Sequence, residues 1–166
     1  ILDRPNKIVY ACLSPRTDIF LLDRFCLLMG YQLVSFFSTD RDGKEIYHTN
    51  VMMAIADRYA VICLESIKDE EKRNEVRNSL ERSGKEVIEL TFDQVLHFAG
   101  NMLQVEGYPG QRILVMSQQA YDSLAQSQIE KLKSYNPILA IPIDTIEKYG
   151  GGSVRCMMAE VFLPKK

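Results

Sequence analysis

The sequence predicts an α/β fold in which one pattern occurs three times. A strand, a helix and a second strand are expected near residues 7–37, near 59–90 and near 112–143. The three units start about 50 residues apart, a period that is typical of repeat architectures. No close sequence identity links the units, so the repeat is one of pattern only.

The first unit begins with an apolar run rich in β-forming residues at 7–13, which predicts a buried strand. Ser14-Pro15 gives the signal for a helix start, because proline is favoured at the first helical position. From Thr17 to Met29 apolar residues predominate, so this helix is expected to be well buried and to end at Gly30. Residues 31–37 return to a strand pattern.

In the second unit, the polar residues 38–45 predict a loop. Two apolar runs follow, Val51–Ile55 and Tyr59–Leu64, and these are expected to form a pair of strands. The segment Asp69–Arg82 is strongly charged, with apolar residues on one face, and predicts an exposed helix. A strand is expected at 85–90.

The third unit begins with a turn that leads into a short strand at 100–105, followed by a strand at 112–116. Ser117 is a helix cap, and the helix is expected to continue to about Ser134. A strand follows at Ile138–Ile143, and a final strand is expected at Cys156–Leu163.

The composition is that of a soluble globular protein and excludes several partners. The 166 residues are enough for one domain with a core, and 46% hydrophobic with 25% charged residues is ordinary for this class. The formal net charge of −2 offers no basic excess for nucleic acid. The apolar stretches are much shorter than the roughly 20 residues of a membrane span, and no secretory signal pattern is present. We therefore expect no nucleic-acid or membrane partner and a cytoplasmic location.

Three of the four cysteines are predicted to be buried thiols, because Cys12, Cys26 and Cys63 lie within apolar runs. No CxxC pair occurs and the chain has only two histidines, so a structural zinc site is not expected. A chain with a core of this size also needs no disulfide framework.

The fourth cysteine follows three consecutive glycines, Gly150–Gly152. Glycines allow positive φ angles and the close approach of a ligand. Cys156 is therefore expected to be exposed where a loop meets a strand, as a nucleophilic thiolate must be. The alternative interpretation is a flexible turn followed by a buried cysteine.

Two further residues suit catalysis or binding. His48 stands between a polar loop and an apolar run, and histidine is well suited to acid–base work near neutral pH; the alternative is a surface histidine. Arg16 lies at a junction between strand and helix, where it could hold a carboxylate with two hydrogen bonds. The alternative interpretation of Arg16 is an ion pair with Asp18 on the surface. His97 is interpreted as a helix-face or core residue.

Four segments carry a resemblance to a known superfamily. Their residues are Ala-Cys-Leu-Ser-Pro-Arg-Thr-Asp at 11–18, His-Thr-Asn-Val-Met-Met at 48–53, Gly-Asn-Met-Leu at 100–103 and Gly-Gly-Gly-Ser-Val-Arg-Cys-Met at 150–157. In this order they resemble the guanidino-group-modifying enzymes, also called the amidinotransferase or pentein superfamily. The chain is most similar to the citrulline-utilisation hydrolases and the dimethylarginine dimethylaminohydrolases.

The resemblance covers essentially the whole chain and implies a fold. The superfamily forms a pseudo-fivefold α/β propeller of ββαβ modules, and about three modules would be present here. Residues 1–166 are then expected to form the C-terminal portion of a single α/β-propeller catalytic domain.

The resemblance also implies a reaction, the hydrolysis of a non-peptide C–N bond in a guanidino or ureido group. Cys156 would attack the central carbon, and His48 would move protons to the leaving amine and activate water. Arg16 would hold the carboxylate of a small amino-acid substrate. Ammonia would be released, with neither a metal nor an organic cofactor.

The chain departs from the family pattern in two respects. Related enzymes carry a catalytic carboxylate, in a Glu-Gly-Thr-Gly or Gly-Gly-Asp segment, just before the strand that leads to the Ser-x-Arg-Thr motif, and the chain has no such segment. We therefore expect this chain alone to be incomplete as an enzyme, and its expected partners are N-terminal modules of the same protein or a self-association partner. The second departure is Asn50, where deiminases commonly have an aspartate. A neutral amide suits a neutral ureido group, since an unpaired buried cation is costly, and this favours citrulline over arginine.

Two alternatives to the hydrolase remain open on the sequence. An amidinotransferase would use an amine in place of water on the same fold. A degenerate, non-catalytic domain would keep the fold and lack the upstream carboxylate, although Cys156 and His48 are both present.

Overall fold

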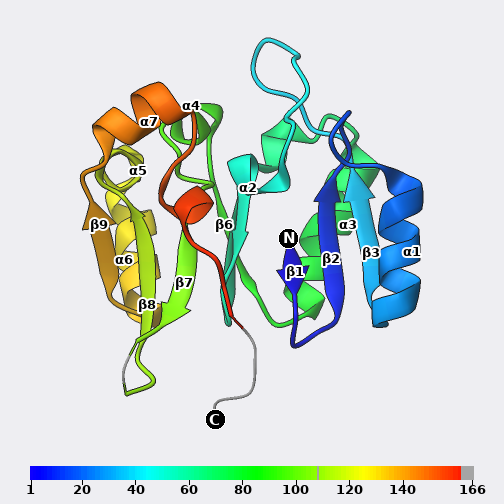
Figure 1. Cartoon of the computed structure of the whole chain (residues 1–166), viewed down its shortest axis with the longest axis horizontal. Coiled ribbons are helices and arrows are strands. Elements are labelled where there is room, and N and C mark those ends of the chain that lie inside the picture. Colours follow the sequence, from blue (N-terminus) through cyan, green and yellow to red (C-terminus); the bar gives the residue numbers. More distant parts are fainter. Residues whose placement is uncertain (108, 162–166) are drawn as a thin grey trace.

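The computed structural model describes residues 1–107 and 109–161 and consists of three ββαβ units (Figure 1). The first contains β1 (Leu2–Asp3), β2 (Ile8–Cys12), α1 (Ile19–Met29) and β3 (Gln32–Phe36). The second contains β4 (Met53–Ile55), β5 (Tyr59–Ile62), α3 (Glu70–Arg82) and β6 (Glu86–Glu89). The third contains β7 (Leu103–Glu106), β8 (Arg112–Ser117), α5 (Gln118–Ser123), α6 (Gln126–Tyr135) and β9 (Ile138–Ile141).

Short elements connect the units or follow the last one. They are α2 (Thr49–Met52), the 3₁₀ turn η1 (Leu64–Ser66), α4 (Phe92–Leu96), α7 (Asp144–Gly150) and the 3₁₀ turn η2 (Val154–Met157).

All three units share one strand topology. In each three-stranded sheet the first two strands pair antiparallel, and the second and third pair parallel. A parallel pair requires a crossover connection, and in every unit one or two helices provide it. The expected fold class, α/β with three ββαβ modules, is therefore confirmed.

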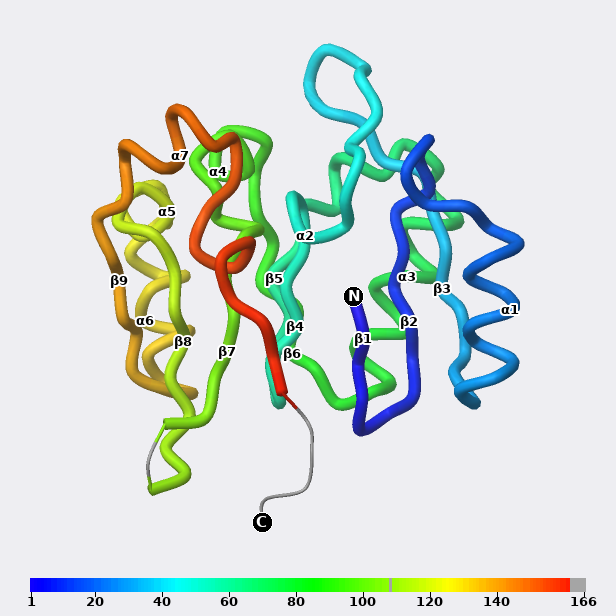
Figure 2. The backbone as a smooth tube through the Cα atoms, in the orientation of Figure 1, coloured from blue at the N-terminus to red at the C-terminus, as the bar shows by residue number. Residues whose placement is uncertain are grey.

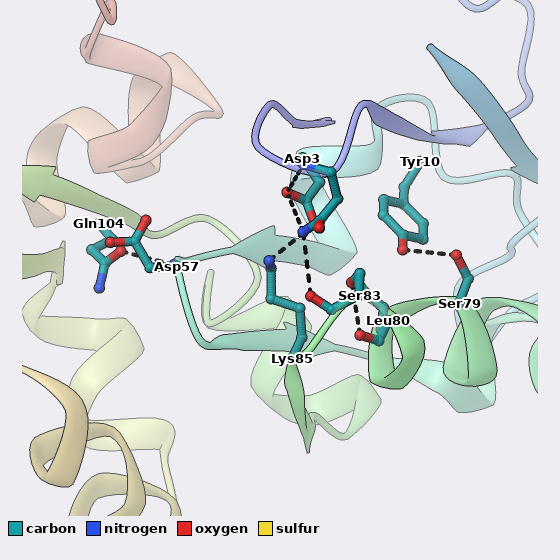
Figure 3. Close-up of polar contacts among 9 residues, drawn as sticks. Asp3, Tyr10, Asp57, Ser79, Leu80, Ser83, Lys85 and Gln104 are labelled. Carbon is teal, nitrogen blue, oxygen red and sulfur yellow. Dashed lines mark hydrogen bonds and ion pairs between the residues drawn. The ribbon is translucent and has the colours of Figure 1, made fainter.

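The helices of the second and third units also pack against the preceding unit, which joins the sheets into a continuous core. The hydroxyl groups of Tyr10 in β2 and Ser79 in α3 are hydrogen-bonded at 2.9 Å (Figure 3). Tyr59 in β5 packs against Tyr135 at the end of α6, with ring centroids 5.0 Å apart and ring planes tilted by 35°. Figure 2 shows α1 at the outer edge of the first unit, beside β3, and α3 of the second unit also lies close to β3. A helix therefore lies at each junction between units.

Helix α1 differs because only Cys26 among its residues is buried. Phe20, Leu27 and Leu28 are 80, 84 and 73% exposed. The prediction of a well-buried helix here is wrong for the described residues, none of which forms a sheet that covers the outer face of α1. Nowhere in the described part of the chain is a helix long and apolar enough to cross a membrane.

Two helix boundaries differ from the predictions. Helix α1 begins at Ile19 rather than at Ser14-Pro15, because the Asp18 carboxylate accepts the backbone N–H of Leu21 at 2.9 Å and caps the helix. The helix predicted from Ser117 to about Ser134 is divided into α5 and α6, and the residues between them have extended backbone.

The final strand predicted at Cys156–Leu163 is wrong over the residues that the structure describes; residues 162 and 163 lie outside them. Hydrogen bonds from the backbone N–H of Cys156 to Ser153 O, at 3.0 Å, and of Met158 to Arg155 O, at 3.1 Å, form the turn η2 instead. Between positions 158 and 161 no strand is formed. An apolar run needs a partner strand to become part of a sheet.

Candidate active site

Helix α2 occupies a fixed position at the carboxyl ends of β2 and β5. The backbone N–H of Cys12 donates to the Thr49 hydroxyl at 2.9 Å, and the N–H of Cys63 donates to the Met52 carbonyl at 2.9 Å. His48 is the N-cap residue of this helix and is exposed. Residues 51 and 52 were expected to begin a strand, and these contacts with distant strand ends explain why they form a helical turn.

The turn before β7 packs directly against α2. A Cβ atom added to Gly100 would lie 2.2 Å from the carbonyl oxygen of Val51, so only glycine fits there. The next residue, Asn101, is buried and donates its side-chain Nδ2 to the Asn50 carbonyl at 3.2 Å. The Gly100-Asn101 turn and α2 therefore form one rigid assembly.

Gly100→Ala is expected to destabilise the protein by about 3 kcal/mol, because the clash is with backbone and no side chain can move aside. The free energy of urea unfolding measures the effect. Gly150→Ala is the matched control: its added Cβ would lie 3.7 Å from the Ile146 side chain, an ordinary contact. Equal stability of the two variants would contradict the packing described here.

Cys156 is exposed and belongs to the turn η2. In Figure 1 this turn is the short red coil beside α2. Its Sγ atom accepts a hydrogen bond from Asn101 Nδ2 at 3.3 Å, and Asn50 Nδ2 lies 4.0 Å away. A Cβ atom on Gly152 would lie 3.3 Å from the same sulfur, so a glycine keeps the space beside the thiol open. The exposed thiol agrees with the expectation for this cysteine and not with the buried alternative.

A buried carboxylate anchors the segment that carries Cys156. The hydroxyl of Ser153 donates to Glu147 Oε1 at 2.6 Å, and Gln119 Nε2 lies 3.4 Å from the other oxygen. Ser153 and Glu147 are both buried. The glycine segment is therefore a restrained connection, in which Gly150 ends α7 and Gly151 caps it with a φ of 67°.

The structure groups the other two predicted residues around Tyr47. The Arg16 guanidinium lies 5.0 Å from the centre of the Tyr47 ring, and the rings of Tyr47 and His48 are 4.7 Å apart. The Ser14 hydroxyl donates to the Tyr47 carbonyl at 2.9 Å. Within the described residues no hydrogen bond joins His48 to Cys156. His48 and Asn50 both belong to the first turn of α2, where His48 is the N-cap residue.

Sequence reasoning missed two residues of this site. Asn101 belongs to a segment that carries the resemblance, yet no role was predicted for it, because its contact with Cys156 spans 55 residues. Tyr47 gave no signal beyond its place next to His48.

The other three cysteines are buried free thiols, as predicted. Burial raises the pKa of Cys63 to about 11 and also raises the pKa values of Cys12 and Cys26. A thiol with a raised pKa stays protonated, and therefore weakly nucleophilic, at neutral pH. Their environments contrast with that of the exposed Cys156.

A family model and several solved structures match the chain. The model for the eukaryotic N,N dimethylarginine dimethylhydrolases matches residues 1–163. ArgZ, an arginine dihydrolase from the ornithine–ammonia cycle in cyanobacteria, has a TM-score of 0.73 at 16% identity; the match covers 99% of this chain and 24% of ArgZ. The N-terminal domain of ArgZ bound to product gives 0.71 at 16% identity, covering 95% of this chain and 52% of that domain.

AgrE, in a ternary complex with ornithine and NAD⁺, has a TM-score of 0.72 at 18% identity, covering 100% of this chain and 22% of AgrE. No curated protein gives a significant match. At these identities the structural likeness shows the fold, and this chain spans about a quarter of the length of ArgZ.

Proposed function

The chain belongs to the eukaryotic N,N dimethylarginine dimethylhydrolase family, and from this premise we propose that it contributes the nucleophile of a cysteine-dependent hydrolase. The bond cleaved is a C–N bond in the guanidino or ureido group of an arginine-like amino acid. The observation that carries the proposal is the exposed Cys156 thiol, which contacts the side-chain amide of Asn101 beside the helix that His48 caps.

The proposed reaction has two steps. The Cys156 thiolate forms an S–C bond with the central carbon, and the bond from that carbon to its terminal nitrogen breaks as His48 supplies a proton to the leaving ammonia. Water then gives a proton to His48 and attacks the same carbon, and the S–C bond breaks to return the thiolate. With citrulline the product of the second step is a carbamate.

Arg16 is proposed to hold the substrate carboxylate. A guanidinium group binds a carboxylate with two parallel hydrogen bonds, and the Arg16 side chain is exposed. Its contact with Tyr47, which in turn contacts His48, supports a single binding surface for both ends of an amino acid.

Citrulline is the proposed substrate. Asn50 Nδ2 lies 4.0 Å from the Cys156 sulfur, so the amide of Asn50 borders the space for the reacting carbon. A neutral amide matches a neutral ureido group, whereas a guanidinium cation would gain from a carboxylate at this position.

Asn50→Asp is expected to shift the preference from citrulline toward arginine by about 10-fold or more in the ratio of kcat/KM values, because a hydrogen bond to a charged group is stronger than a neutral one. Ammonia release from each substrate by the full-length protein measures the ratio. Asn74→Asp adds the same charge on the exposed side of α3 and should leave the ratio unchanged.

The same assay tests the proposed function itself. Release of ammonia from citrulline or arginine supports a hydrolase, and a product that forms only with an added amine supports an amidinotransferase. Failure to cleave either substrate, with and without an amine, would favour the non-catalytic alternative. An unchanged ratio in Asn50→Asp would remove the argument for citrulline while leaving the hydrolase intact.

Further modules are proposed to complete the domain, with this chain as the C-terminal portion of one propeller. The exposed apolar face of α1 supports this, because α3 and α6 each pack against a preceding unit at the corresponding position. We also propose that these modules supply the catalytic carboxylate. A cytoplasmic location suits an enzyme that depends on a free thiol, since that compartment keeps thiols reduced.

A further inference from the structure

Asn101 is a buried polar residue whose side chain is directed entirely into the site. It is 3% exposed. Its Nδ2 donates to the Asn50 carbonyl at 3.2 Å and to the Cys156 sulfur at 3.3 Å. The Cys156 thiol can also act as the donor, because its sulfur lies 3.6 Å from Asn101 Oδ1. One amide therefore joins the reactive sulfur to the backbone of α2.

This contact matters because Cys156 is otherwise poorly restrained. Its side chain is exposed on a short 3₁₀ turn, where an unbound thiol would rotate among staggered rotamers. A hydrogen bond from a buried and fixed donor selects one rotamer, and its two N–H groups allow Asn101 to hold α2 and the sulfur at the same time.

An amide is also suited to both protonation states of the sulfur. The neutral thiol can donate to the amide oxygen, and the thiolate can accept from the amide N–H. A hydrogen bond to an ionised acceptor is the stronger of the two, so the amide favours the thiolate. A carboxylate in the same position could only accept, and its charge would repel the thiolate.

We propose that Asn101 is a catalytic residue of this site, which orients the Cys156 sulfur and stabilises its thiolate by direct hydrogen bonding. The catalytic role of Asn101 rests on the proposed function. The effect of its hydrogen bond on the Cys156 sulfur can be measured without any substrate.

The test is the rate at which iodoacetamide alkylates Cys156 at one fixed pH near neutrality. In this reaction the thiolate forms an S–C bond and iodide leaves. Mass spectrometry of the peptide that contains Cys156 follows the reaction, and the three buried cysteines serve as slowly reacting internal references. Asn101→Leu is expected to lower the rate about tenfold, since a hydrogen bond to a charged group is lost.

Asn101→Asp is expected to be slower still, although its shape is closer to that of asparagine. This order separates the proposal from a purely structural role, in which the isosteric aspartate would resemble the wild type more than leucine does. Asn136→Leu is the matched control: Asn136 is also buried and hydrogen-bonded, to Tyr59 and Gln104 away from the sulfur. It should leave the alkylation rate unchanged.

An alkylation rate unchanged in Asn101→Leu, with citrulline hydrolysis intact in the wild type, would overturn the inference and leave the hydrolase standing. If alkylation is slower in Asn101→Leu but the wild type turns over no substrate, the hydrogen bond between Asn101 and Cys156 is supported and the proposed hydrolase is overturned. If the leucine variant does not fold, Asn101→Ala decides the question, with the same slowing expected.

Discussion

Cys156→Ala is expected to abolish ammonia release by the full-length protein, with a loss of roughly 10⁴-fold or more in kcat, as for nucleophiles of other covalent enzymes. The cause is chemical, because no other group at this position can form the S–C bond of the first step. Cys156→Ser should be nearly as inactive, since the first step starts from a thiolate with His48 already protonated, and a neutral serine hydroxyl is a weak nucleophile. Because Cys156 is exposed, neither change should disturb folding.

Detection of the covalent intermediate tests whether Cys156 itself is the nucleophile. Wild-type protein quenched during turnover should carry a covalent adduct on Cys156, visible by mass spectrometry, and Cys156→Ala should carry none. Cys26→Ala provides the matched control, because Cys26 is a buried thiol in α1 and should retain both activity and adduct. Normal hydrolysis by Cys156→Ala would remove the cysteine mechanism altogether.

The fold could be predicted from the sequence because the units repeat a strong local pattern. Apolar runs of β-forming residues alternate with a charged amphipathic helix such as the one at Glu70–Arg82, and the chain has few competing signals. The helix and strand boundaries that were predicted wrongly depend on single contacts. The Asp18 cap moved the start of α1, and the strand expected after Cys156 has no partner in the described part of the chain.

The candidate site was predictable only in part. Arg16, His48 and Cys156 are predicted as site residues because they stand in motifs next to loops, and Asn50 is predicted from the family resemblance; their roles stay predictions. The contacts of Asn101 and Tyr47 were not found, because they depend on how separate units pack. Helix α2 is the clearest case, because Val51 and Met52 fit a strand pattern locally. The hydrogen bond from the Cys12 N–H to Thr49 and the close packing of Gly100 against Val51 hold this segment in a helical turn.

The same dependence on packing between units predicts a large effect on stability at the junction between the first and second units. Lys85→Met is expected to lower the free energy of unfolding by about 3–5 kcal/mol, because it leaves a buried charge without its partner. Lys85 Nζ lies 3.0 Å from the Asp3 carboxylate, with the side chains 3% and 1% exposed (Figure 3). Urea unfolding of each variant gives the change in free energy.

This ion pair is one part of a junction between the first and second units. Asn6 donates its side-chain Nδ2 to Asp3 Oδ2 at 3.0 Å and to the Ser83 carbonyl at 3.2 Å. The turn between β1 and β2 is thereby joined to the turn between α3 and β6. Since Asn6 supplies no charge, it cannot replace the lysine, and the buried Asp3 side chain would lose its ion-pair partner.

Two further variants separate the buried charge from the loss of packing. Lys72→Met removes one member of an exposed pair with Glu75 and should change the unfolding midpoint little. Asp3→Asn combined with Lys85→Met removes both charges while keeping an acceptor for Asn6, so it should be more stable than Lys85→Met alone. A double variant no more stable than the single one would mean that the lysine acts through its apolar stem, and the pair would then have no special part in joining the units.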